Sequence, residues 1–430
     1  MSKKIKATSH HTKGLRLLVI GGGASGLTAA IVAARAGAQV TILEQRESVG
    51  KKLLATGNGR CNYTNTDLNV SKFYTAEEAF ITDLLETYSA TFMLDFFKKL
   101  GVLSRERNGY VYPYTDQATT IRDALVSELH ALHVTIHTTT TVTRISPIAP
   151  HHNSSEHAYI VETNQGKFTA ERIILATGGK AGLPRNASGD GYHLASQLGY
   201  PITPLTPALT GLQGAGTFYK KIAGLRVDAT VTARINQQEL GSDTGEVQLT
   251  DYGISGIPVF QISRLISQAL AQHTKQVEVV INFLPRYTTI EMEHLIQQRL
   301  AVLGGRTMQE FVNGIFKDKL GRFLLETARI PSTILAKDVT PNQWKHFLHT
   351  CMEFRISIIG VNDFAKAQVT AGGIPLSSFT SHLESKTHPG LYVTGELLDV
   401  DGICGGYNLH FAWATGILAG THATKRYNEN

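Results

Sequence analysis

A glycine-rich turn after an apolar run constrains this chain more than any other stretch. The run Leu17-Leu18-Val19-Ile20 leads into Gly21-Gly22-Gly23-Ala24-Ser25-Gly26, and a pattern of small residues typical of a helix follows. Gly21, Gly23 and Gly26 occupy the three glycine positions of a dinucleotide fingerprint, which serve the tight turn, the approach of a pyrophosphate and close helix–strand packing. Free N–H groups at the start of such a helix attract phosphate. The stretch therefore predicts a strand, a phosphate-binding turn and a helix.

A second apolar stretch, 39–43, ends at Glu44 with Gln45 beside it. Glu44 lies 18 positions after Gly26, close to the ~20 at which the carboxylate of such a fold binds a ribose diol. We therefore expect Glu44 and Gln45 to contact a bound dinucleotide. Taken alone, these signals are compatible with NAD and with FAD.

Composition and charge limit the class of protein. The chain has 430 residues, of which 42% are hydrophobic and 18% charged, so it can bury a sizeable core in two or three domains of ~150 residues each. Its formal charge is +6, and the first sixteen residues contain five Lys or Arg and no acid. We expect a solvated tail there rather than an arm that binds nucleic acid.

The three cysteines, Cys61, Cys351 and Cys404, lie far apart and form no CxxC motif. This spacing argues against a disulfide framework, a zinc site and a dithiol redox pair, and it favours a reducing, cytoplasmic compartment. The stretch 15–34 resembles a targeting segment, but glycines interrupt it, and no other window is apolar over ~18 residues. We therefore expect no transmembrane helix and no metal site.

Residues 50–65 are rich in glycine, asparagine, threonine and basic residues, with little apolar periodicity. This composition is typical of a surface loop, because Gly and Asn tolerate a left-handed backbone. Since the stretch directly follows the fingerprint and its acid, we favour a loop that offers backbone N–H groups to the cofactor.

Two further apolar strands end in glycine-rich corners. The first leads into Ala176-Thr177-Gly178-Gly179, and the second leads into Gly395-Glu396. A glycine-rich run, 399–408, and a helix of small residues follow the second corner. Dinucleotides bind outside the carboxyl ends of such strands. Several strand ends of this kind, together with Glu44, favour FAD over NAD.

The sequence pattern of the chain changes between residues 200 and 360. Prolines cluster at the start of this region, alternating segments then indicate antiparallel strands, and the pattern of residues 288–355 is largely helical. We therefore predict an α/β fold. It comprises a split Rossmann-like FAD-binding domain at 1–199 and 361–430, an inserted antiparallel β subdomain at 200–284 and a helical subdomain at 285–360.

Taken together, the motifs resemble those of the aminoacetone oxidase family. These are bacterial FAD-dependent flavoproteins of the glutathione-reductase-like superfamily, also labelled NAD(P)/FAD-dependent oxidoreductases. The matching stretches, in family order, are 21–26, 50–65, 176–179, 189–192, 250–258, 367–373 and 395–408. The most specific are the run 57–62 and the run 395–399 together with 405–408. One departure is Ile257 before Pro258.

The resemblance implies that FAD binds non-covalently across the split domain. It places the pyrophosphate near Ala24 and Ser25, and the flavin ring near the start of a helix at Gly406. The N–H groups of that helix would face the negative charge of reduced flavin. The full set of residues assigned to the cofactor is Gly21, Gly23, Ala24, Ser25, Gly26, Glu44, Gln45, Lys51, Lys52, Thr56, Gly57, Arg60, Cys61, Asn62, Val142, Ala176, Thr177, Gly178, Gly395, Glu396, Asp401, Gly405, Gly406, Tyr407 and Asn408.

The resemblance also implies an oxidoreductase, and two versions of its chemistry stay open. One takes hydride from NAD(P)H and reduces an activated double bond or carbonyl of a small organic substrate. The other is an amine oxidase that uses oxygen. No second GxGxxG follows a strand, so NAD(P)H would dock transiently at the flavin. We assign no catalytic residue. Tyr112, His193, Tyr252 and Tyr407 lie near glycine-rich corners, and a structural role is expected for each, with catalysis as the alternative.

Two other classes of protein are alternatives: a flavin-dependent tRNA-modifying protein and a non-catalytic flavin-binding protein. The positive charge favours the first. Against it, the basic residues show no interleaved aromatic platform, and little chain follows the last helix to form an RNA-binding domain. We expect a small-molecule partner, no membrane and no nucleic acid, and the sequence does not indicate an oligomeric state.

Overall fold

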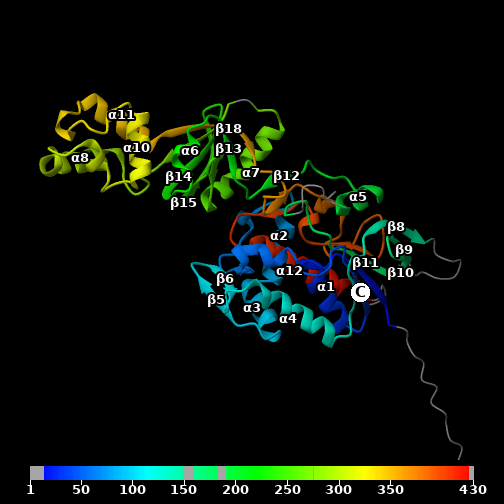
Figure 1. Ribbon diagram of the computed structural model, residues 1–430. Coiled ribbons are helices and arrows are strands. Elements are labelled where there is room, and N and C mark those ends of the chain that lie inside the picture. Colours follow the sequence, from blue (N-terminus) through cyan, green and yellow to red (C-terminus); the bar gives the residue numbers. More distant parts are fainter. Residues whose placement is uncertain (1–13, 149–157, 183–189, 275, 426–430) are drawn as a thin grey trace, which may run out of the picture. The chain divides into compact units, whose positions relative to one another are not determined.

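The computed structural model describes residues 14–148, 158–182, 190–274 and 276–425 (Figure 1). The chain divides into two compact units. The split unit comprises 1–179, 187–204 and 372–430, and the inserted unit comprises 180–186 and 205–371. The basic residues before Gly14 and the pair His151-His152, for which the sequence predicts a hairpin tip, lie outside the described residues.

A parallel sheet of five strands forms the centre of the split unit. The strand order is β20-β11-β1-β2-β7, and every neighbouring pair is parallel. The near-continuous apolar runs are explained by this arrangement, since parallel strands are buried on both faces. The strands are β1 (Arg16–Ile20), β2 (Gln39–Leu43), β7 (Thr135–His137), β11 (Arg172–Leu175) and β20 (Leu391–Val393).

Two helices from opposite ends of the chain pack closely in this unit. They are α1 (Ala24–Arg35) and α12 (Tyr407–Ala423). A Cβ atom at Gly416 would come within 2.3 Å of the Ser25 carbonyl oxygen, and one at Gly420 within 2.5 Å of the Ala29 carbonyl oxygen. The glycines therefore allow the two backbones to approach, and the C-terminal helix becomes part of the N-terminal fold.

The remaining elements of the split unit lie around this centre. Residues 76–100, which show one continuous helical pattern, form two helices because Ser89 caps the second and its side chain accepts a hydrogen bond from the Phe92 N–H. The elements are η1 (Leu53–Gly59), β3 (Thr64–Asn65), η2 (Val70–Lys72), β4 (Phe73–Tyr74), α2 (Glu78–Thr87), α3 (Ala90–Lys99), β5 (Ser104–Arg107), β6 (Tyr110–Pro113), α4 (Ala118–Ala131), β8 (Val142–Ile148), β9 (Ala158–Thr163), β10 (Gly166–Ala170), α5 (Asp190–Gln197), η4 (Leu376–Ser378), η5 (Gly395–Leu397) and β21 (Asp401–Gly402).

A closed antiparallel barrel forms the first part of the inserted unit. Its strand order is β13-β16-β15-β14-β17-β18. The barrel strands are β13 (Leu212–Gly214), β14 (Arg226–Ile235), β15 (Gln238–Leu249), β16 (Gly253–Ser255), β17 (Val277–Asn282) and β18 (Phe354–Val361), with β12 (Thr206–Ala208) paired to β19 (Val369–Ala371) outside it.

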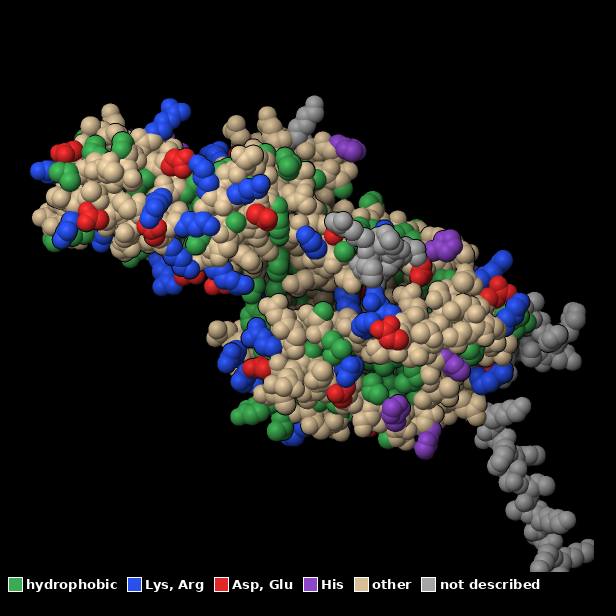
Figure 2. All heavy atoms as spheres, in the orientation of Figure 1, with side chains coloured by type: hydrophobic (Ala, Val, Ile, Leu, Met, Phe, Trp, Pro, Cys, Tyr) green, Lys and Arg blue, Asp and Glu red, His purple; other side chains and the backbone are tan. Residues whose placement is uncertain are grey.

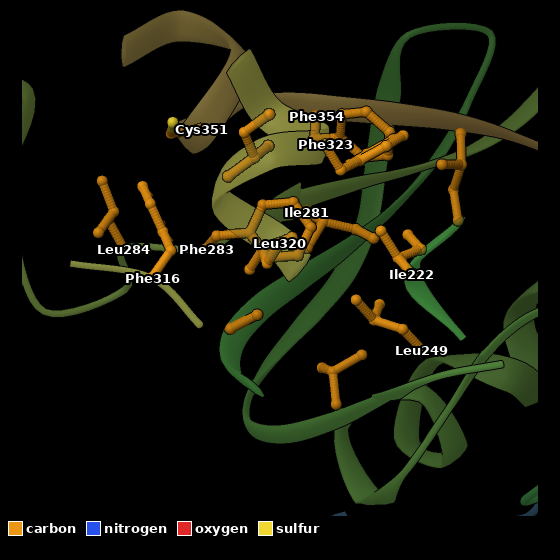
Figure 3. Packing of buried hydrophobic residues seen from close by; sticks show 14 of the residues in the cluster. Ile222, Leu249, Ile281, Phe283, Leu284, Phe316, Leu320, Phe323, Cys351 and Phe354 are labelled. Carbon is orange, nitrogen blue, oxygen red and sulfur yellow. The ribbon is translucent and has the colours of Figure 1, made fainter. Parts of the chain in front are cut away.

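Helices complete the inserted unit. Three of them begin with a capping box, in which a Thr side chain and a Glu or Gln three residues later satisfy the first N–H groups. Phe323 packs on Phe354 of β18 with ring centroids 5.5 Å apart, within the apolar cluster in Figure 3. The helices are α6 (Tyr219–Ile222), α7 (Ile257–Ala271), α8 (Thr289–Leu303), α9 (Met308–Val312), α10 (Asp318–Thr327), η3 (Ala336–Asp338) and α11 (Pro341–Met352).

The predicted fold class is confirmed: the protein is α/β, with a parallel Rossmann-like core and an antiparallel β subdomain. Within the described ranges, no helix is both long and apolar enough to cross a membrane.

Candidate functional site

The fingerprint turn is built around three glycines with different roles. Gly21 has a φ of +106°, and a Cβ there would lie 2.4 Å from the Ala176 carbonyl oxygen. A Cβ at Gly26 would lie 2.0 Å from the Gly21 carbonyl oxygen. A Cβ at Gly23, by contrast, would have no atom within 4 Å. Gly21 and Gly26 are therefore required by the fold, whereas Gly23 leaves open space before α1.

The N-terminus of α1 fits a phosphate group. Gly23 is its N-cap and provides no side-chain cap, and the first turn contains no acidic residue. Ala24 and Ser25 therefore begin a helix whose first N–H groups lack a side-chain partner from the cap. Such a terminus attracts an anion through its N–H groups and its partial positive charge.

Glu44 lies buried at the end of β2, with 8% of its surface exposed. Its Oε2 accepts a hydrogen bond from the Gly22 N–H at 2.7 Å, and its Oε1 accepts one from the Arg46 N–H at 2.8 Å. A carboxylate has about four lone-pair sites, so it retains capacity for ribose hydroxyls. Gln45 is exposed beside it.

Val142 lies close to this acidic residue. The Thr140 N–H donates to the Glu44 carbonyl oxygen at 2.9 Å, and Val142 begins β8 two residues later with a buried side chain. The structure thus brings Glu44 and Val142, which are far apart in the sequence, to the same end of the sheet.

The loop after β2 contains a cluster of left-handed residues. Gly57, Asn58, Gly59 and Cys61 have φ values of +56°, +55°, +82° and +58°. The Cys61 N–H closes the loop by donating to the Thr56 carbonyl oxygen at 3.0 Å. Burial raises the pKa of the Cys61 thiol to about 12. The thiol is therefore protonated at neutral pH and unsuited to thiolate chemistry.

Two lysines begin this loop. Lys51 forms an ion pair with Glu47, and the Lys52 Nζ lies 2.6 Å from Glu396 Oε2. Glu396 belongs to η5, directly after β20. The second ion pair therefore joins the loop to a strand end that lies more than 300 residues later in the sequence.

The ends of β11 and β20 lie beside the first turn of α1. Gly395 has a φ of +69°, and a Cβ there would come within 2.7 Å of Ser25 Oγ. The Ala176 N–H donates to the Ile20 carbonyl oxygen at 2.8 Å. Thr177 Oγ1 is buried without a hydrogen-bond partner among the described residues. Next to it, Gly178 has open space, since a Cβ there would have no atom within 4 Å.

The N-terminus of α12 is shaped by Gly405 and Gly406, with φ values of +142° and +93°. A Cβ at Gly406 would come within 2.6 Å of the Thr64 carbonyl oxygen and 2.9 Å of Asn62 Oδ1. That Asn62 oxygen is buried, and no described residue donates a hydrogen bond to it. An unsatisfied buried acceptor beside a helix N-terminus indicates a site for a polar ligand.

Asn408 and Tyr407 hold this terminus. Asn408 bonds Gly402 twice, accepting from its N–H at 2.8 Å and donating to its carbonyl oxygen at 2.7 Å. Tyr407 is buried, and its ring meets Phe73 edge-on at 5.9 Å. Asp401 is 2% exposed in β21. The Tyr407 side chain thus packs into the fold, while its backbone begins the helix.

The sequence did not reveal a buried support beneath this terminus. His410 Nδ1 lies 2.8 Å from Thr64 Oγ1, and its Nε2 lies 2.7 Å from the Tyr88 carbonyl oxygen. Since only Nε2–H can donate to the carbonyl, Nδ1 accepts from the Thr64 hydroxyl. Burial lowers the pKa of His410 to about 4. The one sequence signal was a histidine within a helix of small and apolar residues.

These residues form one cradle within the split unit, and they fit FAD. The open α1 terminus suits the pyrophosphate, Glu44 suits the adenosine ribose, and Asn62 with the α12 terminus suits the flavin ring. When bound, FAD supplies the capacity to take up and release a hydride. In the ranges that the structure describes, no group of three or more His, Cys, Asp or Glu side chains is placed to hold a metal.

Comparison with known proteins identifies the family of the chain. The family model described as HI0933-like protein Rossmann domain matches residues 15–422. A 3-dehydro-bile acid delta(4,6)-reductase of Clostridium scindens is 42% identical over 414 residues, which cover 96% of this chain and 99% of that protein. A ribosomal RNA dihydrouridine synthase of Haemophilus influenzae is 26% identical over 401 residues, which cover 93% and 96%.

Among solved structures, 3-ketosteroid delta1-dehydrogenase from Sterolibacterium denitrificans matches with a TM-score of 0.51 and 12% identity, covering 96% of this chain and all of that one. This similarity concerns the fold alone. None of the proteins described here is named as an aminoacetone oxidase, so the resemblance in sequence is supported at the level of the wider family. With a family model that spans nearly its whole length, the chain belongs to the HI0933-like Rossmann-domain family.

Proposed function

We propose that this protein is an FAD-dependent reductase that uses hydride from NAD(P)H to saturate a carbon–carbon double bond conjugated to a carbonyl group. The observation that carries the proposal is the 42% identity to a named reductase over 96% of the chain. The name of that relative denotes a diene next to a 3-oxo group, which is a double bond activated by a carbonyl. The coarser prediction, an oxidoreductase, is confirmed by this relative.

Residues of the split unit support the proposal because they would bind FAD and stabilise its reduced form. The α1 terminus at Gly23 would hold the pyrophosphate, and Glu44 would fix the ribose. The N–H groups at Tyr407 and Asn408 would stabilise negative charge on the reduced ring, since a helix terminus contributes ~0.3–2 kcal/mol toward an anion. Such stabilisation favours acceptance of hydride from the nicotinamide.

Anaerobic stopped-flow spectroscopy tests the proposal. The purified holoenzyme is mixed with NADH or NADPH, and loss of the yellow flavin absorbance is followed. We expect bleaching within seconds, and then return of the colour when a 3-oxo-4,6-diene bile acid is added. Rapid recolouring with oxygen and turnover of aminoacetone, without reduction by either nucleotide, would instead support the amine oxidase alternative.

A second candidate is a flavin-dependent RNA reductase. The relatives named ribosomal RNA dihydrouridine synthase, from Haemophilus influenzae and Escherichia coli, are each 26% identical over 93% of this chain. Since the chain also covers 95–96% of them, proteins of this length carry an RNA activity without a further domain. These relatives therefore count against the length argument that disfavours an RNA substrate.

The charges of the inserted unit are relevant to this candidate. Lys and Arg side chains gather over part of that unit in Figure 2, interspersed with Asp and Glu. Several basic residues of the inserted unit form ion pairs, among them Lys221 with Glu326, Arg226 with Glu246, and Arg322 with Asp318. Reduced enzyme should be incubated with ribosomal RNA fragments, and dihydrouridine measured by mass spectrometry. Its formation, with binding that weakens steeply with salt, would favour this candidate.

The nicotinamide donor and the cytoplasmic location stay predictions. The location depends on the three cysteines, which are all free thiols in the structure. The stopped-flow experiment tests the donor directly.

A further inference from the structure

Arg60 and Tyr112 form a pair at the edge of the FAD cradle. The guanidinium of Arg60 lies over the Tyr112 ring, with its central carbon 5.3 Å from the ring centroid. Arg60 Nε also donates to the Gly57 carbonyl oxygen at 3.3 Å. A cation over an aromatic face is attracted by the ring quadrupole. Two contacts therefore hold the guanidinium in place.

Most of the donors in this pair remain available. A guanidinium has five N–H donors, and within the described chain only Nε of Arg60 has a hydrogen-bond acceptor. The Tyr112 hydroxyl has no hydrogen-bond partner among the same residues, and both side chains are partly exposed. Burial raises the pKa of Tyr112 above its usual value, which the nearby Arg60 partly offsets. At neutral pH the phenol is therefore a protonated donor.

The loop after β2 connects the Arg60–Tyr112 pair to the cradle. A Cβ at Gly57 would come 2.9 Å from the Asn62 N and 3.6 Å from Tyr112 Cε1. Asn62 Oδ1 in turn lies beside Gly406 at the start of α12. The pair thus stands next to the part of the split unit that suits the flavin ring.

The backbone around Arg60 is specialised for its position. Asn58 and Cys61, on either side of it, are non-glycine residues with left-handed φ values of +55° and +58°. Such conformations cost of order 1–3 kcal/mol each and persist at ligand sites where the surrounding structure enforces them. The strain is adjacent to the one arginine of the loop, which indicates that the loop is built to present this side chain.

We propose that Arg60 and Tyr112 bind the carbonyl oxygen of the substrate and stabilise the negative charge that develops on it during reduction. This inference rests on the proposed function. The hydride, with its two electrons, comes from flavin that NAD(P)H has reduced, and it adds to the far carbon of the conjugated double bond. The π electrons move to the carbonyl oxygen, giving an enolate held by the guanidinium and phenol donors. A solvent proton on the α-carbon then restores the carbonyl and completes the saturated product.

A carbonyl conjugated to a ring double bond is common to a 3-oxo-4,6-diene steroid acid and to the uracil ring of RNA. The pair would serve either source in the same way. The experiment therefore tests the steroid acid and the RNA separately. The compound that reoxidises the reduced enzyme is identified as the source of the conjugated carbonyl.

The test compares Arg60→Gln and Tyr112→Phe with Arg144→Gln, an exposed arginine of β8. For both pair variants we expect unchanged FAD affinity and unchanged flavin reduction by NAD(P)H. Reoxidation by the conjugated substrate should slow by about 100-fold for Arg60→Gln, the usual effect of losing one oxyanion donor, and less for Tyr112→Phe, which keeps the ring under Arg60. Arg144→Gln should behave as the wild type.

A binding measurement provides a readout that does not depend on turnover. Calorimetry on the oxidised holoenzyme should show about 10-fold tighter binding of the 3-oxo bile acid than of its 3-deoxy counterpart, equal to about 1.4 kcal/mol, and Arg60→Gln should abolish this preference. Two results would overturn the inference. One is that the wild type binds the 3-oxo and the 3-deoxy bile acid equally. The other is weaker FAD binding in Arg60→Gln, because this would return Arg60 to the cofactor role that the sequence predicts. Failure of the proposed function is distinct, because it appears as wild-type flavin that no nicotinamide nucleotide reduces.

Discussion

At the scale of single residues, two glycines of the fingerprint turn allow a matched experiment. A Cβ at Gly23 meets no atom within 4 Å, whereas one at Gly26 falls 2.0 Å from a carbonyl oxygen. Gly23→Ala should therefore fold with an unchanged melting temperature and lose FAD affinity by about 10-fold or more, equal to about 1.4 kcal/mol. Gly26→Ala should instead destabilise the fold by about 1–3 kcal/mol through overpacking.

The measurements are thermal melting of FAD-depleted protein and FAD titration by fluorescence. Because both changes add one methyl group to the same turn, each variant is the control for the other. If Gly23→Ala binds FAD as tightly as the wild type, the open space before α1 is not a ligand site.

His410 gives a prediction of pH dependence. Burial lowers its pKa to about 4, whereas a histidine in the unfolded chain titrates near 6.5. Between these values the unfolded chain binds the proton more readily, so stability present above pH 6.5 is lost as the pH falls toward 4. The loss is on the order of 3 kcal/mol.

His410→Gln should flatten this dependence, as measured by melting temperature at a series of pH values. Burial also lowers the pKa of His422 to about 4, so the wild type loses stability through both residues. The difference between the wild type and His410→Gln isolates His410. If the melting temperature of His410→Gln falls with pH as steeply as that of the wild type, a buried neutral imidazole at this position is excluded.

Part of the site was predictable at this scale. Gly21, Gly23, Gly26 and Glu44 follow from spacing, because a nucleotide turn needs these residue types at these intervals. The His410 support and the Arg60–Tyr112 pair were not predictable, because their partners come from strands and helices whose pairing is not visible in a local pattern. Tyr112 faces Arg60 only because β6 pairs with β3 and β5.

At the scale of elements, the contact between α1 and α12 gives a prediction about stability. Alanine in place of glycine inside a helix normally favours the helix by about 1 kcal/mol. At Gly420, however, the new Cβ would lie 2.5 Å from the Ala29 carbonyl oxygen. Gly420→Ala should therefore lower the melting temperature and, by shifting α12, reduce FAD content.

Gly305→Ala, in the turn after α8, is the steric control, since a Cβ there would meet no atom within 4 Å. This variant should leave the melting temperature and the FAD content unchanged. A Gly420→Ala protein that is more stable than the wild type would show that the two helices can separate at little cost.

Elements with strong local signals were predicted well. The sequence pattern predicts helices at 119–132 and 259–271 and a turn at Asn108-Gly109. The structure has helices at 118–131 and 257–271 and a hairpin of β5 and β6 at that turn. The closure of the barrel was not predicted. Its strand β13 pairs with β18, so that Leu212 faces Val361, and such distant register leaves no local pattern. For the same reason, β18 (Phe354–Val361) extends across the expected boundary at 360/361.

At the scale of the whole molecule, the division into two units predicts where FAD acts. Since the cradle residues described above belong to the split unit, FAD at 100 times its dissociation constant should stabilise that unit by about 2.7 kcal/mol. Hydrogen exchange should slow at amides near 23–25 and 405–408 when FAD is added. Amides of β14 and β17 in the inserted unit serve as the internal control, and equal protection there would contradict the assignment.

The order in which this chain is synthesised has a consequence for its cofactor. The phosphate-binding turn at Gly21 leaves the ribosome first, but Gly406 and α12, which pack against it, leave nearly 400 residues later. The inserted unit is complete by then, since its last residue is 371. FAD capture by the complete cradle must therefore wait until α12 has been synthesised, and any nascent chain stalled before α12 carries an unfilled cradle.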